Sequence, residues 1–156
     1  MDEGRRVLLR GAGATGALAA ALAAGLLRPE RALAATWDQS AFRQKDLADA
    51  LKSIGAEGAT ASKEVVLDVP EIAENGAVVP VEITSRVPGT TSIAVVIDKN
   101  PFPLTSKFNF MQGALPYVKL NVKMGQSSNI RAIAEAGGKH YVAMREVKVT
   151  IGGCGG

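Results

Sequence analysis

Cysteine and histidine are almost absent from this sequence. Among 156 residues there is one cysteine, Cys154, and one histidine, His140. A single cysteine cannot form a disulfide within the chain, and one cysteine with one histidine falls short of the ligand set of a zinc or iron site. The counts therefore exclude a disulfide framework and a Cys/His metal centre. We expect His140 to be a solvated or hydrogen-bonded residue of a strand.

The patterns expected of an active site are missing as well. The one G-x-G-x-x-G pattern, at residues 11–16, lies in an apolar segment with no predicted strand before it, so it is not a phosphate-binding loop. No nucleophile elbow accompanies His140, which leaves no basis for a Ser/His/Asp triad. Acidic residues occur singly along polar strand faces, as is typical of solvated surface. The sequence predicts a protein that is not an enzyme by itself.

Once the N-terminus is set aside, basic and acidic residues nearly balance and the net charge is small. The full chain has 18 basic and 15 acidic residues and a formal net charge of +3. Five basic and three acidic residues precede Ala35, which leaves 13 basic against 12 acidic residues. No basic stripe interleaves with the aromatic residues, which make up 4% of the chain. Nucleic-acid binding is therefore not expected.

Residues 1–34 have the pattern of an export signal. Arg5 and Arg6 precede an apolar run rich in alanine, glycine and leucine at residues 11–27, and residues 32–34 match the small-x-small cleavage pattern. The paired arginines, with a leucine and a further arginine behind them, resemble a twin-arginine signal. An ordinary Sec signal and an uncleaved membrane anchor are the alternatives, the anchor being least favoured because the run is only weakly apolar. We expect a periplasmic protein that is free of the membrane after cleavage.

Residues 35–62 are predicted to hold a helix and a linker. Leu47, Leu51 and Ile54 recur with helical spacing and make a narrow apolar stripe, which indicates a helix packed on the domain or on a partner. The helix is expected over residues 37–54, with a cap from Asp38 or Ser40 and an end at Gly55. Residues 55–62, rich in small side chains, would then form the linker.

From residue 63 the apolar spacing changes to about two residues, which predicts strands. Residues 93–97 form a continuous apolar run, as expected of a strand buried on both faces. The seven expected strands follow one another with no helix between them, which predicts an all-β, immunoglobulin-like antiparallel β-sandwich over residues 63–151. They lie near residues 65–69, 79–87, 93–97, 108–110, 118–124, 130–135 and 141–151.

The connections between these strands carry their own signals. The pairs Asn75-Gly76, Pro88-Gly89 and Gly137-Gly138 predict turns. Two prolines make Asp98–Pro103 a stiff loop. The apolar alternation shifts between residues 144 and 147, which predicts a β-bulge in the last strand.

The last five residues, Gly152-Gly153-Cys154-Gly155-Gly156, set the only cysteine between two pairs of glycines. Glycine has no Cβ and samples both signs of φ, so we expect a flexible arm. An extended chain spans at most about 3.3–3.6 Å per residue, which places the Cys154 Cα roughly 10 Å beyond Ile151. A free thiol has a pKa near 8.5 and only its thiolate is nucleophilic, so activation is expected to come from a receiving pocket. This pattern is typical of a carrier's covalent attachment point.

The signal, the short helix, the seven-strand body and the Gly-Gly-Cys-Gly-Gly segment together resemble the SoxY family. That family is the sulfur-carrying subunit of the SoxYZ complex in bacterial thiosulfate oxidation. The loop with Asn100-Pro101-Phe102-Pro103 also looks like this family, and the resemblance covers essentially the whole chain. It implies an immunoglobulin-like sandwich that forms a heterodimer with SoxZ, a cysteine-free sandwich without the arm. It also implies that Cys154 is the covalent sulfur attachment site and that the neighbouring glycines keep the arm slim and mobile.

The resemblance implies a set of enzyme partners too. SoxXA, a c-type haem enzyme, would conjugate thiosulfate oxidatively to Cys154. SoxB, a manganese hydrolase, would release the terminal sulfone as sulfate, and SoxCD, a molybdenum-haem sulfane dehydrogenase, would oxidise the remaining sulfur where it is present. The carrier itself would hold no cofactor, only sulfur adducts on Cys154.

Two other functions stay open from the residues alone. An exported immunoglobulin-like structural or adhesion module could use Cys154 for an interchain disulfide, and its body would have the same strand pattern. A ubiquitin-like carrier ends in Gly-Gly and holds sulfur as a thiocarboxylate, which Gly155 and Gly156 satisfy. The ubiquitin-like alternative is disfavoured for two reasons. Such carriers are activated in the cytoplasm, whereas this chain has an export signal. They also have a long central helix, which the predicted strand-only body lacks.

Overall fold

The structure, a computed structural model, describes residues 39–150. The expected signal with Arg5 and Arg6, the start of the expected helix and the Gly152–Gly156 arm with Cys154 lie outside the described residues. The chain divides into two units, residues 1–37 and 38–156, and the second holds every described residue. Within residues 39–150 the elements are η1 Ala41–Arg43, α2 Leu47–Ser53, β1 Thr60–Ala61, β2 Val65–Asp68, β3 Ile72–Ala73, β4 Val79–Ser85, β5 Thr90–Ile97, β6 Leu104–Asn109, β7 Tyr117–Val122, β8 Ser128–Ala136 and β9 Lys139–Val149.

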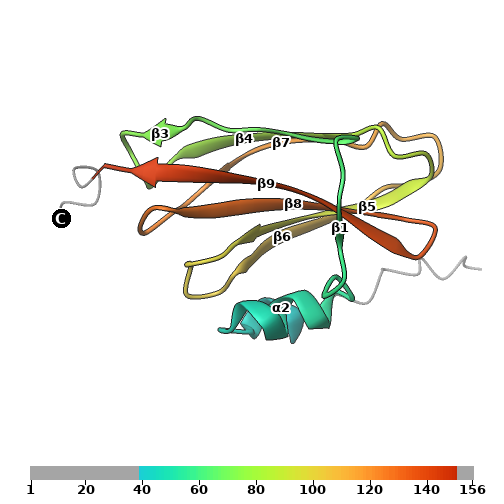
Figure 1. Cartoon of the computed structure of the whole chain (residues 1–156), viewed down its shortest axis with the longest axis horizontal. Coiled ribbons are helices and arrows are strands. Elements are labelled where there is room, and N and C mark those ends of the chain that lie inside the picture. Colours follow the sequence, from blue (N-terminus) through green and yellow to red (C-terminus); the bar gives the residue numbers. More distant parts are fainter. Residues whose placement is uncertain (1–38, 151–156) are drawn as a thin grey trace, which may run out of the picture. The chain divides into compact units, whose positions relative to one another are not determined.

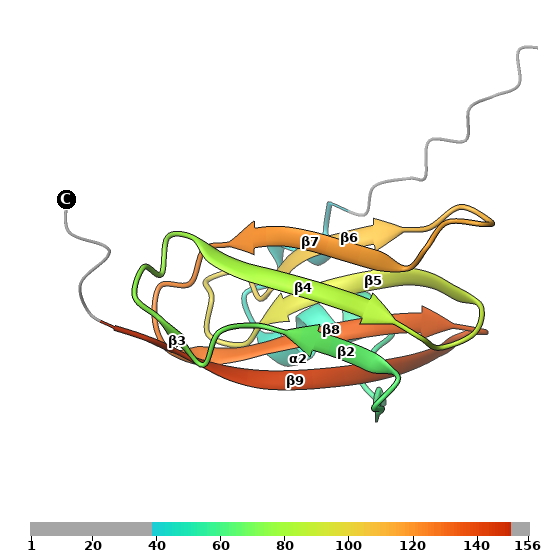
Figure 2. The ribbon, with the colours of Figure 1, turned by 90° about the horizontal axis from the view of Figure 1, so that it is seen from above.

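The strands form two packed sheets, which confirms the predicted sandwich. The larger sheet has the order β1-β9-β8-β5-β6, and the smaller one has the order β2-β4-β7. Neighbouring long strands are antiparallel, whereas the two-residue strands β1 and β3 both run parallel to β9. Figure 1 shows the two sheets stacked, with α2 on the outer face of the larger one, and Figure 2 shows the smaller sheet from above. No helix among the described residues is long and apolar enough to cross a membrane.

Strand β5 faces apolar neighbours on both sides, as its continuous apolar run predicts. Ile93, Val95 and Ile97 are fully buried in the core between the two sheets. Ala94 and Val96 point the other way, into a second apolar cluster that lies against the helical segment. Because side chains alternate along a strand, this one segment contributes to both cores. It thereby places the larger sheet between the helical segment and the smaller sheet.

The helical segment differs from the single helix expected over residues 37–54. Its described part is a 3₁₀ turn and a separate seven-residue α-helix, with Gln44 extended between them at ψ 130°. The cap is Asp46, whose carboxylate accepts hydrogen bonds from the amides of Ala48 at 2.7 Å and Asp49 at 3.3 Å. An N-cap residue needs an extended backbone, so this cap starts a new helix and ends any continuous one.

The other end of the helix is as expected. Gly55 has a φ of 72°, a left-handed conformation that terminates the helix without steric cost. The stripe of Leu47, Leu51 and Ile54 packs against the second apolar cluster on the larger sheet. The stripe therefore anchors the helical segment to the domain.

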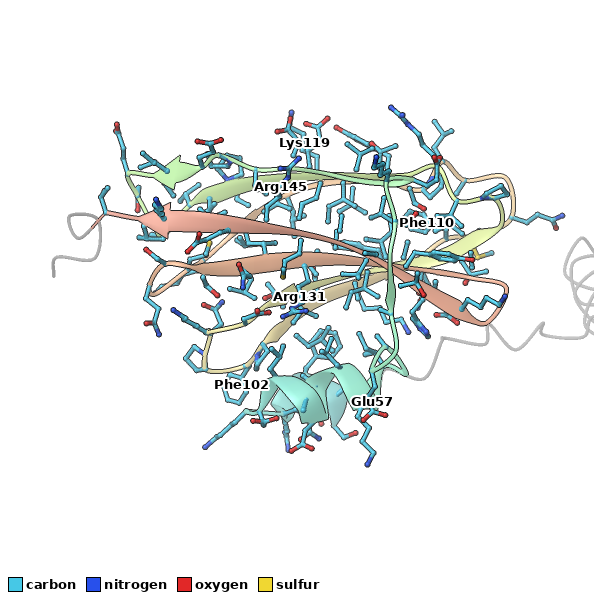
Figure 3. All side chains as sticks on the ribbon, viewed as in Figure 1. Glu57, Phe102, Phe110, Lys119, Arg131 and Arg145 are labelled. Carbon is cyan, nitrogen blue, oxygen red and sulfur yellow. The ribbon has the colours of Figure 1, made fainter. Side chains whose placement is uncertain are left out.

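Two further expectations need correction. The predicted linker contributes strand β1, whose Thr60 and Ala61 pair with β9, because an edge strand offers open hydrogen-bonding groups. The predicted β-bulge is absent from β9, which pairs with β8 without any register shift. The odd-numbered side chains of β9 face the smaller sheet, and Arg145 occupies one of these positions beside that sheet (Figure 3). The apolar alternation in the sequence therefore shifts because one arginine stands among the apolar residues on this face of β9, and not because the strand contains an extra residue.

Removal of the helix cap tests this account of the helical segment. We expect Asp46→Ala to lower the free energy of unfolding by about 1 kcal/mol, because the Ala48 and Asp49 amides lose their acceptor. Denaturant unfolding measures the change. Asp46→Asn retains a capping oxygen and should unfold like the parent chain. Equal destabilisation by both substitutions would contradict the capping role.

Candidate functional site

The sequence places the candidate site at Cys154 and its four glycines, outside the described residues. What the structure describes is the segment that leads to them, residues 147–150, here called the β9 end. Val147 is fully buried and pairs with Ser128 of β8. The β9 end is thus an integral part of the sandwich up to four residues before the cysteine.

One edge of the β9 end is held by β3. The amide of Lys148 donates to the carbonyl of Glu71 at 2.9 Å, and that of Thr150 donates to the carbonyl of Ala73 at 3.1 Å. The pairing is parallel, with Ile72 opposite Lys148. These hydrogen bonds fix the backbone direction at Thr150, where the path towards Cys154 begins.

The other edge is held by side chains and a close backbone approach. The amide of Val149 donates to Ser127 Oγ at 2.9 Å. The amide of Met124 donates to the carbonyl of Gly76 at 2.7 Å, which draws the turn after β3 against the β9 end. A Cβ on Gly76 would lie 2.4 Å from the Met124 carbonyl oxygen and 2.8 Å from Val149 Cγ1. Glycine is therefore required there, although the sequence indicated it only as part of a turn.

The Asp98–Pro103 loop lies at this same end of the sandwich, beside the β7–β8 connection (Figure 1). The Asp98 carboxylate accepts hydrogen bonds from Arg131 Nε at 2.6 Å and Nη2 at 2.9 Å, and from Asn129 Nδ2 at 3.2 Å. The hydrogen bond to Asp98 raises the pKa of Arg131. A bidentate, partly buried pair of this kind holds a loop in one orientation. The stiffness predicted from the prolines thus has a second cause in Asp98.

The loop is also tied to the neighbouring connection. Asn100 Nδ2 donates to the carbonyl of Lys123 at 2.8 Å, and the amide of Lys99 donates to Ser128 Oγ at 3.0 Å. Residues 123–128 therefore bridge the loop and the β9 end, since Ser127 binds Val149. Sequence reasoning found the loop but not this connection, because the contacts join residues far apart in the chain.

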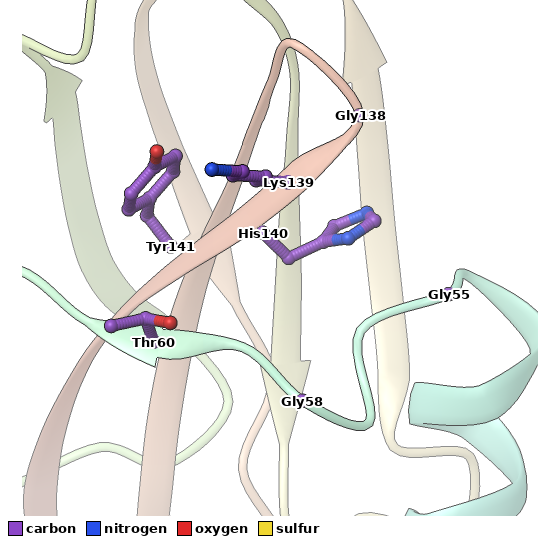
Figure 4. A pocket seen from close by; sticks show the side chains of 7 residues that line it. All are labelled: Gly55, Gly58, Thr60, Gly138, Lys139, His140 and Tyr141. Carbon is purple, nitrogen blue, oxygen red and sulfur yellow. The ribbon is translucent and has the colours of Figure 1, made fainter.

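His140 lies at the opposite end of β9 and is not brought near this region. It belongs to the β8–β9 hairpin and borders an open pocket of about 430 Å³ together with Gly55, Thr60 and Tyr141. The side chains of Lys139 and His140 point to opposite sides of the strand, so they do not converge on one ligand (Figure 4). Among residues 39–150, no three His, Cys, Asp or Glu side chains are placed to hold a metal ion.

A substitution at Gly76 tests how the β9 end is held. We expect Gly76→Ala to lower the free energy of unfolding by roughly 1–3 kcal/mol, because the new methyl group overlaps the Met124 carbonyl. Amide hydrogen exchange at Val149 and Thr150 should accelerate at the same time. Gly125→Ala is the matched control, since a Cβ there meets nothing within 4 Å. Unchanged exchange at the β9 end in the Gly76 variant would refute the close approach.

The comparisons with known proteins agree with this architecture. The family model described as "Sulfur oxidation protein SoxY" matches residues 51–154, a range that ends at Cys154. The sulfur carrier protein SoxY from Chlorobium limicola f thiosulfatophilum is similar in structure, with a TM-score of 0.62 and 37% sequence identity over 68% of this chain and 97% of that one. Curated proteins give no match.

Two superoxide reductase (neelaredoxin) structures from Ignicoccus hospitalis, both of single-substitution variants, share the fold alone. The first has a TM-score of 0.50 and 17% identity, with coverage of 64% of this chain and 87% of that one. The second has a TM-score of 0.50 and 18% identity, with coverage of 59% and 81%. The family match over two thirds of the chain and the 37% identity to a solved SoxY decide the assignment: the chain belongs to the SoxY family of sulfur oxidation proteins.

Proposed function

We propose that this protein is a covalent carrier of sulfur intermediates in periplasmic thiosulfate oxidation, with Cys154 as the attachment site. The observation that carries the proposal is the position of the only cysteine, four residues beyond Thr150, the last residue of the β9 end, which is hydrogen-bonded on both edges. The family match that extends to residue 154 supports it. In this proposal the protein is not an enzyme and holds no cofactor besides its sulfur adducts.

The chemistry requires a thiol and little else from the carrier. In the first step the sulfane sulfur of thiosulfate bonds to Cys154 Sγ, one proton leaves, and two electrons pass to a c-type haem enzyme of the SoxXA kind. In the second step a SoxB-like manganese hydrolase adds water to the sulfone, which breaks the outer S–S bond. Sulfate and a proton leave, and a persulfide stays on Cys154. A SoxCD-like enzyme would oxidise that sulfur further.

A covalent bond suits a substrate that must visit several enzymes, because the intermediate cannot diffuse away between them. The glycines on both sides of Cys154 carry no side chains that would block a narrow pocket. Cys154 is the fourth residue after Thr150, so the two Cα atoms are at most about 14 Å apart. The proposed arm therefore presents the thiol outside the body while the sandwich stays at the pocket entrance.

The proposal includes a partner subunit and a location. A SoxZ-like sandwich would form the heterodimer, and the Arg5-Arg6 signal would direct export by the twin-arginine route, which carries folded or assembled proteins. The heterodimer is expected to be the form that meets the enzymes.

Intact mass of the mature protein tests the attachment site. After thiosulfate turnover under non-reducing conditions, we expect masses that correspond to added sulfur and thiosulfonate on the chain and that disappear with a reductant. Cys154→Ser should abolish these adducts and all turnover, and its melting temperature should equal that of the parent. A bare thiol or a simple disulfide dimer under every condition would overturn the carrier function and favour a structural sandwich.

The glycines beside the cysteine supply a second test. We expect Gly153→Leu and Gly155→Leu to reduce sulfate release at least about tenfold, because a branched side chain does not enter a pocket shaped for glycine. Both variants should unfold like the parent, and a small reagent such as iodoacetamide should alkylate Cys154 at the parent rate. Full turnover by the leucine variants would contradict the narrow-pocket argument.

A further inference from the structure

Ser127 takes over from β8 at the point where the backbone pairing between β8 and β9 stops. That pairing ends at Ser128 with Val147. Beyond it, the amide of Val149 donates to Ser127 Oγ at 2.9 Å, and the Ser127 hydroxyl donates to the carbonyl of Val149 at 3.5 Å. We name these two hydrogen bonds the Ser127 clamp. One side chain thus binds both backbone groups of a residue that β8 no longer reaches.

The backbone that carries Ser127 is held on both sides of this residue. On one side Met124 is fully buried, and its amide donates to the carbonyl of Gly76 at 2.7 Å. On the other side Ser128 is buried, and its hydroxyl accepts a hydrogen bond from the amide of Lys99 at 3.0 Å. The Ser127 hydroxyl is therefore presented to β9 from a fixed position.

The two edges of the β9 end are held by different kinds of group. On the β3 side, Lys148 and Thr150 donate to backbone carbonyls, which no side-chain substitution removes. On the other side, the Ser127 clamp depends on one hydroxyl. Figure 1 shows the tip of β9 beside β3 and the start of β8. Loss of this hydroxyl would leave Val149 held on one edge only, and one hydrogen bond corresponds to roughly a fivefold change in a local opening equilibrium.

Opening of the β9 end would change how far the thiol travels. Cys154 is the fourth residue after Thr150, so its Cα lies at most about 14 Å from that exit point. If residues 148–150 leave the sandwich, Val147 becomes the exit point and the limit rises to about 25 Å. The effective concentration of a flexible segment's end falls roughly as the −3/2 power of its length, so this change lowers it about two- to threefold.

We propose that Ser127 is a positioning residue of the carrier reaction. By binding the backbone of Val149 it sets the residue at which the arm begins, and with it the volume in which the Cys154 thiol moves. This rests on the proposed carrier function and adds to it a residue of the sandwich. Ser127 acts through Val149 and takes no part in the chemistry. The volume is a property of the carrier alone, so the role of Ser127 does not depend on which surface an enzyme binds.

A nitroxide spin label on Cys154 tests the clamp without any enzyme. The only cysteine takes the label with no further substitution, and the label broadens the NMR signals of amides that it reaches. In the carrier with its partner subunit, we expect Ser127→Ala to extend this broadening to amides farther from Thr150. Amide exchange at Val149 should accelerate about fivefold. A merely structural role of Ser127 would lower the melting temperature and leave the broadened region as in the parent.

Two variants serve as controls for the label experiment. Ser127→Thr retains the hydroxyl and should keep the parent broadening and the parent exchange rate. Ser53→Ala removes a hydroxyl that donates to the carbonyl of Ala50 at 2.7 Å in α2, on the outer face of the larger sheet, and should also behave like the parent. An unchanged broadened region in Ser127→Ala, or an equal extension in Ser53→Ala, overturns the clamp.

Sulfate release tests the role of the clamp in the reaction. The substrate is the carrier with its partner subunit, conjugated with thiosulfate, and the enzyme is the SoxB-like hydrolase of the same organism. We expect Ser127→Ala to lower kcat/KM about two- to threefold, and Ser127→Thr and Ser53→Ala to keep the parent value. Iodoacetamide should alkylate Cys154 of all three variants at the parent rate, because a small reagent needs no positioned arm. A parent kcat/KM in Ser127→Ala would overturn the positioning role.

The two proposals fail in different ways. A parent chain that carries no sulfur adduct after thiosulfate turnover would overturn the carrier function, whereas the spin label would still report the clamp. Adducts on the parent, together with an unchanged broadened region in Ser127→Ala, would leave the carrier function standing and remove only the role of Ser127.

Discussion

Hydrogen bonding along both edges of β9 is the constraint on which the rest of the structure depends. One edge pairs with β8 over nine residue pairs, from Ser128 with Val147 to Ala136 with Lys139. The other edge, which would be open at the border of the sheet, is covered near its two ends by β1 and β3. An uncovered edge strand is a site of unwanted pairing, so these short strands protect the sheet as well as fix β9. The strand that leads to Cys154 is therefore paired on both edges near each of its ends.

Thr150 marks the boundary between the hydrogen-bonded body and the glycine-rich segment that follows it. Up to Thr150 the backbone is fixed by bonds to Ala73, Glu71 and Ser127, and the glycines that follow have no side chains to restrict them. In a carrier the division has a physical purpose. Under the proposed function, a fixed exit point would give each enzyme a reproducible body surface to bind, while the slim segment would bring the sulfur into a pocket that the sandwich cannot enter.

Much of the architecture could be predicted from local pattern. Alternation of apolar residues located the long strands, and the unbroken apolar run of residues 93–97 indicated that β5 is buried on both faces. The pairs Pro88-Gly89 and Gly137-Gly138 turn as expected, with Gly89, Gly137 and Gly138 all at positive φ. Local pattern failed where one residue changed the outcome. Asp46 starts a new helix inside a helical stripe, and Arg145 interrupts an apolar row without altering the register.

By itself, the sequence determined the sandwich class, the one apolar strand shared by both cores, and the identity of the only thiol, because periodicity and composition are local properties. The tertiary structure alone decided how the β9 end is held, why Gly76 has no Cβ, and which apolar side chains stand beside the exit point. Strands β1 and β3 have two residues each, too few for a period, and exist only because β9 offers them an edge. Ile72 and Val78 look like core residues in the sequence, whereas the folded chain leaves their side chains 58% and 53% exposed.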